Sequence, residues 1–172
     1  VSNMFPETLS DYKSQVWLCR TYIDQNDMTS ADLLLNKILS NESFPDKLNS
    51  ELSLVASHFY LKNKMYTSAK EELLMSINLS KKKKRARIYF ILAQLNAIEK
   101  NYSQATKFFE KAVNSSSNYE LTFNAKIKRA QSYDIGFGGV EKIKKELHDM
   151  LGDEKNAEYI DVIYFSLAEI SI

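Results

Sequence analysis

Small and apolar side chains recur along the chain with the spacing of one helix face. In four segments, an apolar residue follows a small or aliphatic one after four positions, and a third residue of the same face follows three positions later. This spacing puts side chains on one side of a helix, and a fixed period of this kind is typical of stacked helix pairs. The segments are Ala31-Leu35-Ile38, Ala69-Leu73-Ser76, Ala105-Phe109-Ala112 and Ile143-Leu147-Met150, spaced 38, 36 and 38 residues apart.

A second helical pattern precedes each of these segments, and a last copy follows them. The copies are Trp17-Leu18-Thr21-Tyr22, Leu52-Val55-Ala56-Tyr60, Tyr89-Leu92-Ala93, Ile127-Ala130-Tyr133 and the unpaired Tyr164-Leu167-Ala168. The pattern therefore predicts an all-α fold without strands. Nine helices are expected, over 8–25, 28–40, 45–63, 66–80, 83–99, 102–115, 118–134, 139–151 and 155–171.

Each helix pair alone exposes an apolar face, so we expect neighbouring pairs to stack into one solenoid segment over 1–172. The pairs are expected at about 8–40, 45–80, 83–115 and 118–151, with a lone helix at 155–171. Three short polar turns, at 25–27, 62–64 and 99–101, have the length of an antiparallel helix hairpin. The fourth turn, 135–139, holds three of the four glycines, which predicts a longer and looser loop.

Composition excludes several classes of protein. The 23 basic and 22 acidic side chains nearly cancel, so a dedicated nucleic-acid binder is not expected. No apolar run is long enough to cross a membrane, and the first residues carry no signal peptide. Because the chain opens at Val1 and stops at Ile172 inside a helical pattern, we expect it to be a piece of a larger protein.

The sequence predicts no catalytic residue, no metal site and no cofactor, and therefore no enzyme. The two histidines, His58 and His148, fall in different repeats, and no cluster has the spacing of metal ligands. Cys19 occupies the small-residue position where paired helices press together, so we interpret it as a packing residue. The loop Gly136-Phe137-Gly138-Gly139 lacks the lysine and hydroxyl residue of a phosphate-binding loop.

A candidate binding surface is the concave side of the stack, formed by first helices where they point away from their partners. This lining carries both charge signs and scattered aliphatic residues, which suits an extended peptide or a partner helix. The candidates are Lys13, Val16, Arg20, Asp24, Glu51, Val55, His58, Lys62, Arg87, Ile91, Gln94, Ile98, Lys128, Gln131 and Asp134.

The strongest local charge is the basic run Lys81, Lys82, Lys83, Lys84 and Arg85. We place it where the second pair ends, a position at which cations stabilise exposed helix carbonyls. A solvated junction between pairs is the simpler interpretation, and an acidic protein partner, phosphates or anionic lipid remain alternatives.

The repeats resemble the tetratricopeptide family. The unit with Tyr89, Leu92 and Ala93, followed by Ala105-Phe109-Ala112, matches best, and the one with Ile143 departs from the family's alanine. The resemblance covers nearly the whole chain and implies a right-handed α-solenoid. It is informative about the fold and says little about function.

A narrower resemblance is to the large tetratricopeptide lipoproteins of the PorW/SprE kind, which serve type IX secretion and gliding motility. The segments that carry it are 119–127, 153–159 and 163–170. It implies a piece of a periplasmic protein that a lipid outside this piece anchors to the outer membrane, with components of the secretion and motility complex as protein partners.

The expected function is a protein-protein interaction scaffold whose partner the sequence does not name. Two alternatives stay open at this point: a structural spacer that continues into further repeats, and a regulatory peptide-binding module in the cytoplasm.

Overall fold

The computed structural model describes residues 8–80, 82–133 and 139–171, and all regular elements in these ranges are helices, as the sequence predicts. The chain divides into two compact units, Val1–Ser80 and Lys81–Ile172, which are described separately. The continuous solenoid over 1–172 stays a prediction.

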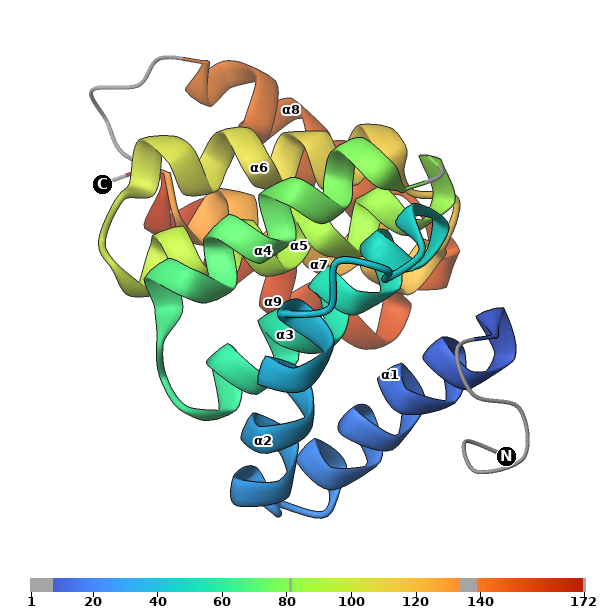
Figure 1. Cartoon of the computed structure of the whole chain (residues 1–172). Helices are drawn as coiled ribbons and strands as arrows, with labels where there is room; N and C mark the ends of the chain where they lie inside the picture. Colours follow the sequence, from blue (N-terminus) through green and yellow to red (C-terminus); the bar gives the residue numbers. More distant parts are fainter. Residues whose placement is uncertain (1–7, 81, 134–138, 172) are drawn as a thin grey trace. The chain divides into compact units, whose positions relative to one another are not determined.

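The first unit is built from two helix hairpins (Figure 1). The helices are α1 (Leu9–Asp24), α2 (Met28–Leu39), α3 (Asn49–Lys62) and α4 (Tyr66–Leu79), with a short 3-10 turn, η1 (Asp46–Leu48), before α3. Their shared core includes Cys19 and Ile23 of α1, Leu35 of α2 and Phe59 of α3. Because α1 packs against both α2 and α3, it buries two adjacent faces.

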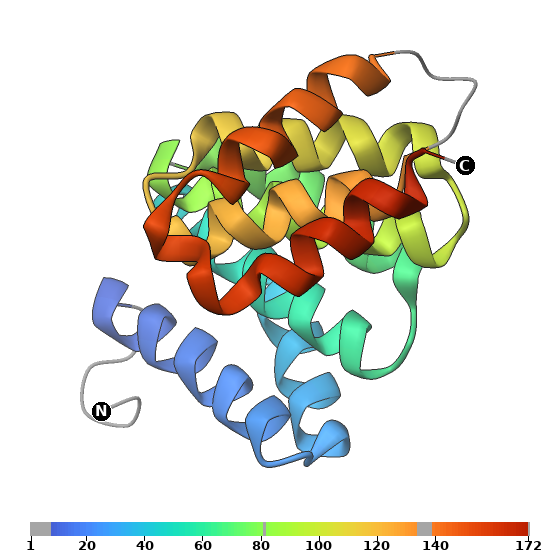
Figure 2. The ribbon, with the colours of Figure 1, turned by 180° about the vertical axis from the view of Figure 1, so that it is seen from behind.

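The second unit continues the alternation of helices. Its elements are α5 (Lys82–Ile98), α6 (Tyr102–Ser115), α7 (Tyr119–Gln131), α8 (Val140–Leu151), the 3-10 segment η3 (Glu154–Tyr159) and α9 (Ile160–Glu169). Figure 2 shows α9 alongside α7, which it contacts. Ala93, Ala105 and Ala112 let α5 and α6 approach closely around Phe109, whose side chain is 1% exposed.

Three hairpins close with the same backbone turn. Asn26, Lys64 and Lys100 have φ values of 64°, 58° and 59°, in the left-handed region. The next residue then donates a hydrogen bond back across the turn: Asp27 N to Tyr22 O, Met65 N to Tyr60 O and Asn101 N to Asn96 O, at 2.8–2.9 Å. This arrangement satisfies carbonyls that a helix end leaves without a partner. The repeat period is therefore also a period of backbone conformation.

The fourth hairpin lacks such a tight turn. The connection between α7 and α8 covers 132–139, longer than the others as the glycines predict, and 134–138 lie outside the described residues. Side chains fix this pair instead. Arg129 of α7 donates to Glu146 of α8 in a short contact, and Thr106 Oγ1 of α6 donates to Ser132 O at 3.1 Å. Both bonds hold α7 against its neighbours where the chain turns.

Two predicted helices begin later than expected. The predicted helix 45–63 starts as a 3-10 turn, in which Leu48 N donates to Pro45 O, and becomes α-helical at Asn49. The predicted helix 155–171 is 3-10 up to Tyr159 and α-helical from Ile160. Near that start, the buried Asn156 side chain donates to Met150 O at 2.7 Å and thereby ties η3 to the end of α8. Side-chain bonds of this kind compete with a regular helix start.

Candidate functional site

Two neighbouring furrows on the second unit form the candidate site. The first, the α5/α7 furrow, has a volume of about 640 Å³. Its residues are Arg87, Phe90, Ile91 and Gln94 of α5, the cap residue Asn118, and Glu120, Leu121, Asn124 and Lys128 of α7.

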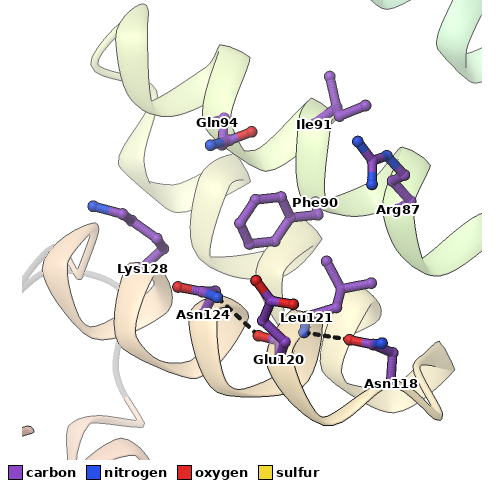
Figure 3. Close-up of a pocket in the computed structure, with 9 residues that line it drawn as sticks. All are labelled: Arg87, Phe90, Ile91, Gln94, Asn118, Glu120, Leu121, Asn124 and Lys128. Atoms are coloured by element: carbon purple, nitrogen blue, oxygen red, sulfur yellow. Dashed lines mark hydrogen bonds between the residues drawn. The ribbon is translucent and has the colours of Figure 1, made fainter. Parts of the chain in front are cut away.

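The α5/α7 furrow has an apolar middle and cationic ends. Figure 3 shows Phe90 between the two helices, with Glu120 and Leu121 opposite. Arg87 lies at one end, and Lys128 lies at the other end. The ten residue-to-residue steps from the cap residue 118 to 128 correspond to about 15 Å of helix, the reach of four or five extended residues.

Amide side chains complete the walls of this furrow. Asn118 Oδ1 accepts a hydrogen bond from Leu121 N at 2.8 Å and so caps α7. This bond does not use the side-chain nitrogen of Asn118. Asn124 Nδ2 donates to Glu120 O at 2.9 Å (Figure 3). Each of these amides keeps donor or acceptor capacity for a ligand backbone, because one bond uses only part of it.

The second, the α7/α9 furrow, is lined by aromatic rings and has a volume of about 610 Å³. Tyr119 and Phe123 have ring centroids 6.4 Å apart, and those of Phe123 and Tyr159 are 5.1 Å apart. The remaining lining residues are Glu120, Asn124 and Val162. Glu120 and Asn124 thus face both furrows, and α7 is their common wall.

Four of the residues predicted for the concave side meet at the α5/α7 furrow. They are Arg87, Ile91, Gln94 and Lys128. Gln131 follows one turn after Lys128 and accepts a 2.9 Å hydrogen bond from Lys128 Nζ. Ile98 is exposed on the last turn of α5, and Asp134 lies outside the described residues.

The prediction missed Phe90, Asn118, Glu120, Leu121 and Asn124. The spacing of Leu121, Asn124 and Lys128 is that of one helix face, so continuing the stripe backwards from Lys128 would have found part of this wall. No comparable signal marks Tyr159, which reaches the α7/α9 furrow from a different segment.

In the first unit, the prediction is wrong for Val16 and Val55. Their side chains are 2% and 7% exposed and belong to the core. The reason is the contact between α1 and α3, which buries a face that the sequence pattern assigned to the surface. Glu51, at the start of α3, is half-buried.

Two of the other candidates of the first unit, Arg20 and His58, lie beside the carboxylate of a third, Asp24. Arg20 Nε lies 3.7 Å from Asp24 Oδ2, and His58 Nδ1 lies 3.8 Å from Asp24 Oδ1. Burial lowers the pKa of His58, and the charges of Lys62 and Arg20 lower it further, against the opposing effect of Asp24. These effects together favour the neutral form of the imidazole. Lys13 is exposed two turns before Arg20.

The basic run has a different place from the one predicted. Helix α4 ends at Leu79 and α5 begins at Lys82, so Lys82, Lys83 and Lys84 form the first turn of α5. Cations at a helix N-terminus oppose the helix dipole, so the stabilising role expected for them at a C-terminus is wrong. Lys84 is exposed and Arg85 is half-buried, whereas Lys81 lies outside the described residues.

Chemical side chains elsewhere form no reactive cluster within the described ranges. No group of three His, Cys, Asp or Glu residues there could hold a metal ion. Cys19 is fully buried, and burial raises the pKa of its thiol to about 11, so the reactive thiolate is scarce at neutral pH. Among the described helices, none has the length and apolar character that crossing a membrane requires.

Comparison with known proteins adds no relative to this picture. No family model matches the chain, and no curated protein matches it either. Function is therefore argued from the two furrows.

Proposed function

We propose that the chain is a protein-binding scaffold segment and that α5, α7 and α9 present its binding face. The observation that carries the proposal is the pair of furrows that share α7 as a wall. Clefts with apolar floors, amide walls and charged ends suit an extended polypeptide, because amides can bind its backbone while the floor accepts side chains.

The α5/α7 furrow favours a segment with an apolar side chain between acidic ones. Phe90, Ile91 and Leu121 offer the apolar contact. Arg87 and Lys128 offer positive charge at the two ends, and the exposed Lys84 lies one turn before Arg87. The single carboxylate of Glu120 does not balance these cations. Such complementarity contributes more to partner choice and association rate than to affinity.

The resemblance to the tetratricopeptide lipoproteins of type IX secretion and gliding motility agrees with this function. On that basis we propose that the parent protein is a component of a cell-envelope secretion or gliding complex and that the partner is another component of it. A cytoplasmic peptide-binding module would use the same face.

The test is photo-crosslinking in the native host, with the full-length parent carrying a photoreactive residue at position 94. We expect a crosslink to a second protein that is lost when Asn124→Ala and Lys128→Ala are added to this chain. The matched control adds Asn114→Ala and Lys145→Ala instead, which removes the same side-chain types from exposed positions of α6 and α8. Equal crosslinking by both variants would contradict the proposed face.

One observation favours the spacer as a second candidate. Tyr164 and Phe165 of α9 are each 59% exposed, and Ala168 is exposed. In α5, Tyr89 stacks on Phe108 of α6 with centroids 6.3 Å apart, and Ala93 is fully buried. Helix α9 thus carries the same Tyr-x-x-Leu-Ala pattern without a covering helix among the described residues. Crosslinks from position 164 confined to the parent's own chain would support the spacer.

A further inference from the structure

The α7/α9 furrow presents three neighbouring aromatic rings to solvent. Tyr119 and Tyr159 are 46% and 45% exposed, and Phe123 lies between them in contact with both. Contiguous exposed apolar patches on a soluble protein mark interaction sites, whereas single exposed rings need no such explanation. The ring centroids follow one another at 6.4 and 5.1 Å, near the roughly 6 Å that two residues of a polyproline II helix advance.

Two of these rings, Tyr119 and Phe123, are held in place by contacts within the fold. The Tyr119 hydroxyl donates to Asn156 Oδ1, and Asn156, 2% exposed, donates in turn to Met150 O at 2.7 Å. Phe123 packs against the core formed by α7, α8 and α9. Because these two rings are already fixed, ligand binding costs little additional side-chain entropy at Tyr119 and Phe123.

Carboxylates outnumber cations among the charged residues that the structure places at or beside this furrow. Glu120 lines it, and Asp153 lies near enough to contribute, after burial, to the raised pKa of Tyr119. Lys155 Nζ lies 5.9 Å from the Tyr119 ring centroid. The segment 153–161 carries four carboxylates, Asp153, Glu154, Glu158 and Asp161, against that one lysine. A bound segment with positive charge complements this border.

We propose that the α7/α9 furrow binds a proline-rich segment of a partner protein, in the polyproline II conformation, that carries a basic residue. The inference rests on the proposed function, because it takes the partner to be a polypeptide on this face. Proline-rich segments dock on aromatic-lined grooves since their preformed helix has little entropy to lose and their backbone carbonyls are free to accept hydrogen bonds. Asn124 Nδ2, which uses one N–H on Glu120 O, offers the second to such a carbonyl.

The test is a calorimetric titration of the full chain with synthetic peptides. The probe is a ten-residue proline-rich peptide with two arginines, and two matched peptides replace its prolines by alanine or its arginines by glutamate. We expect saturable binding of the probe and a loss of about tenfold or more in affinity for each replacement. Tyr159→Ala should weaken binding by a similar factor, whereas Tyr164→Ala, on the exposed side of α9, should leave it unchanged.

A second variant guards against loss of structure. Glu120→Lys, at an exposed position, should weaken binding of the arginine peptide. The affinities of this variant for the arginine and glutamate peptides should therefore differ less than those of the native chain. Circular dichroism establishes that each variant is folded.

Three results would overturn the inference. They are absence of probe binding to the full chain, equal affinity for the alanine peptide, and binding of a neutral oligosaccharide, but not the probe, that Tyr159→Ala abolishes. The last outcome would identify a glycan site on the same rings. A persistent crosslink from position 94 alongside any of these results would leave the proposed function standing and remove only the proline-rich ligand.

Discussion

The first and fourth hairpins solve the same packing problem by different means. In the first, α1 and α2 are joined by a three-residue turn with Asn26 in the left-handed region, and Cys19 is buried among apolar side chains. In the fourth, α7 and α8 are joined by a longer connection, and Arg129, 3% exposed, reaches across to Glu146. A tight turn fixes two helices through the backbone, and a loose one leaves that task to side chains.

The difference suggests a reason for burying an ion pair. Desolvation makes such a pair costly, and a well-packed apolar pair of equal volume is often as stable. Arg129 has one further cost, because its Nε is buried without a hydrogen-bond partner among the described residues. We therefore interpret the pair as a device that sets the register of α8 on α7. The three predictions that follow test this contrast, from the largest expected effect to the smallest.

Removing the carboxylate of the fourth hairpin should cost most. Glu146→Ala leaves the guanidinium of Arg129, 3% exposed, without its partner, and we expect the free energy of unfolding to fall by roughly 3 kcal/mol. Arg129→Met should cost less than half as much, because Glu146, 24% exposed, can be hydrated once its partner is gone. Urea denaturation measures both. The opposite ranking of the two variants would show that packing of the Arg129 stem dominates.

The buried thiol of the first hairpin, Cys19, should lower the free energy of unfolding at high pH. Burial raises the pKa of Cys19 from 9.0 to about 11, so in the unfolded chain the thiol ionises first. The folded state is thus stabilised by keeping the Cys19 thiol protonated. This stabilisation is fully present below pH 9, is lost as the pH rises to 11, and amounts to a free energy on the order of 2 kcal/mol. Denaturation curves of the native protein and of Cys19→Ala, recorded from pH 8 to 11, measure this loss. The difference in the free energy of unfolding between the two proteins should become smaller as the pH rises. A difference independent of pH would exclude this role of Cys19.

Substitutions in the turns should change the free energy of unfolding least. Adding a glycine at a left-handed position should raise it, and replacing the left-handed glycine should lower it. Lys64→Gly and Lys100→Gly relieve a left-handed backbone and should each raise the free energy of unfolding by about 0.5 kcal/mol. Gly139→Ala, at φ 83° with nothing within 4 Å of the added Cβ, should lower it by about 1 kcal/mol through strain alone. The control Lys145→Gly, inside α8, should also lower it by about 1 kcal/mol. Thermal denaturation measures all four, and a loss of stability in Lys64→Gly would contradict the argument.

Local signals made most of the fold predictable. The spacing of Ala105, Phe109 and Ala112 fixes a buried helix face, and short polar turns fix where hairpins close. The 3-10 segment η3 was not predictable, because Asn156 bonds to Met150 O and to the Tyr119 hydroxyl only once the chain has folded. Tertiary contacts overrode a sequence pattern that reads as a regular helix.

The candidate site was predictable only along single helices. Arg87, Ile91 and Gln94 follow one stripe of α5, so helical spacing alone placed them together. The prediction that Val16 is exposed was wrong, because helical spacing does not tell whether a helix face meets solvent or the neighbouring helix α3. The α7/α9 furrow joins Tyr119 to Tyr159 across segments, and nothing in the order of residues indicates that meeting.

The common wall of the two furrows has a consequence for avidity. Since Glu120 and Asn124 face both, a partner chain that fills one furrow brings its adjoining residues to the other. The second contact then forms within the complex, at an effective concentration that a short linker can raise to the order of millimolar. Under the proposed function, we therefore expect a peptide long enough to fill both furrows to bind more tightly than fragments that fill only one.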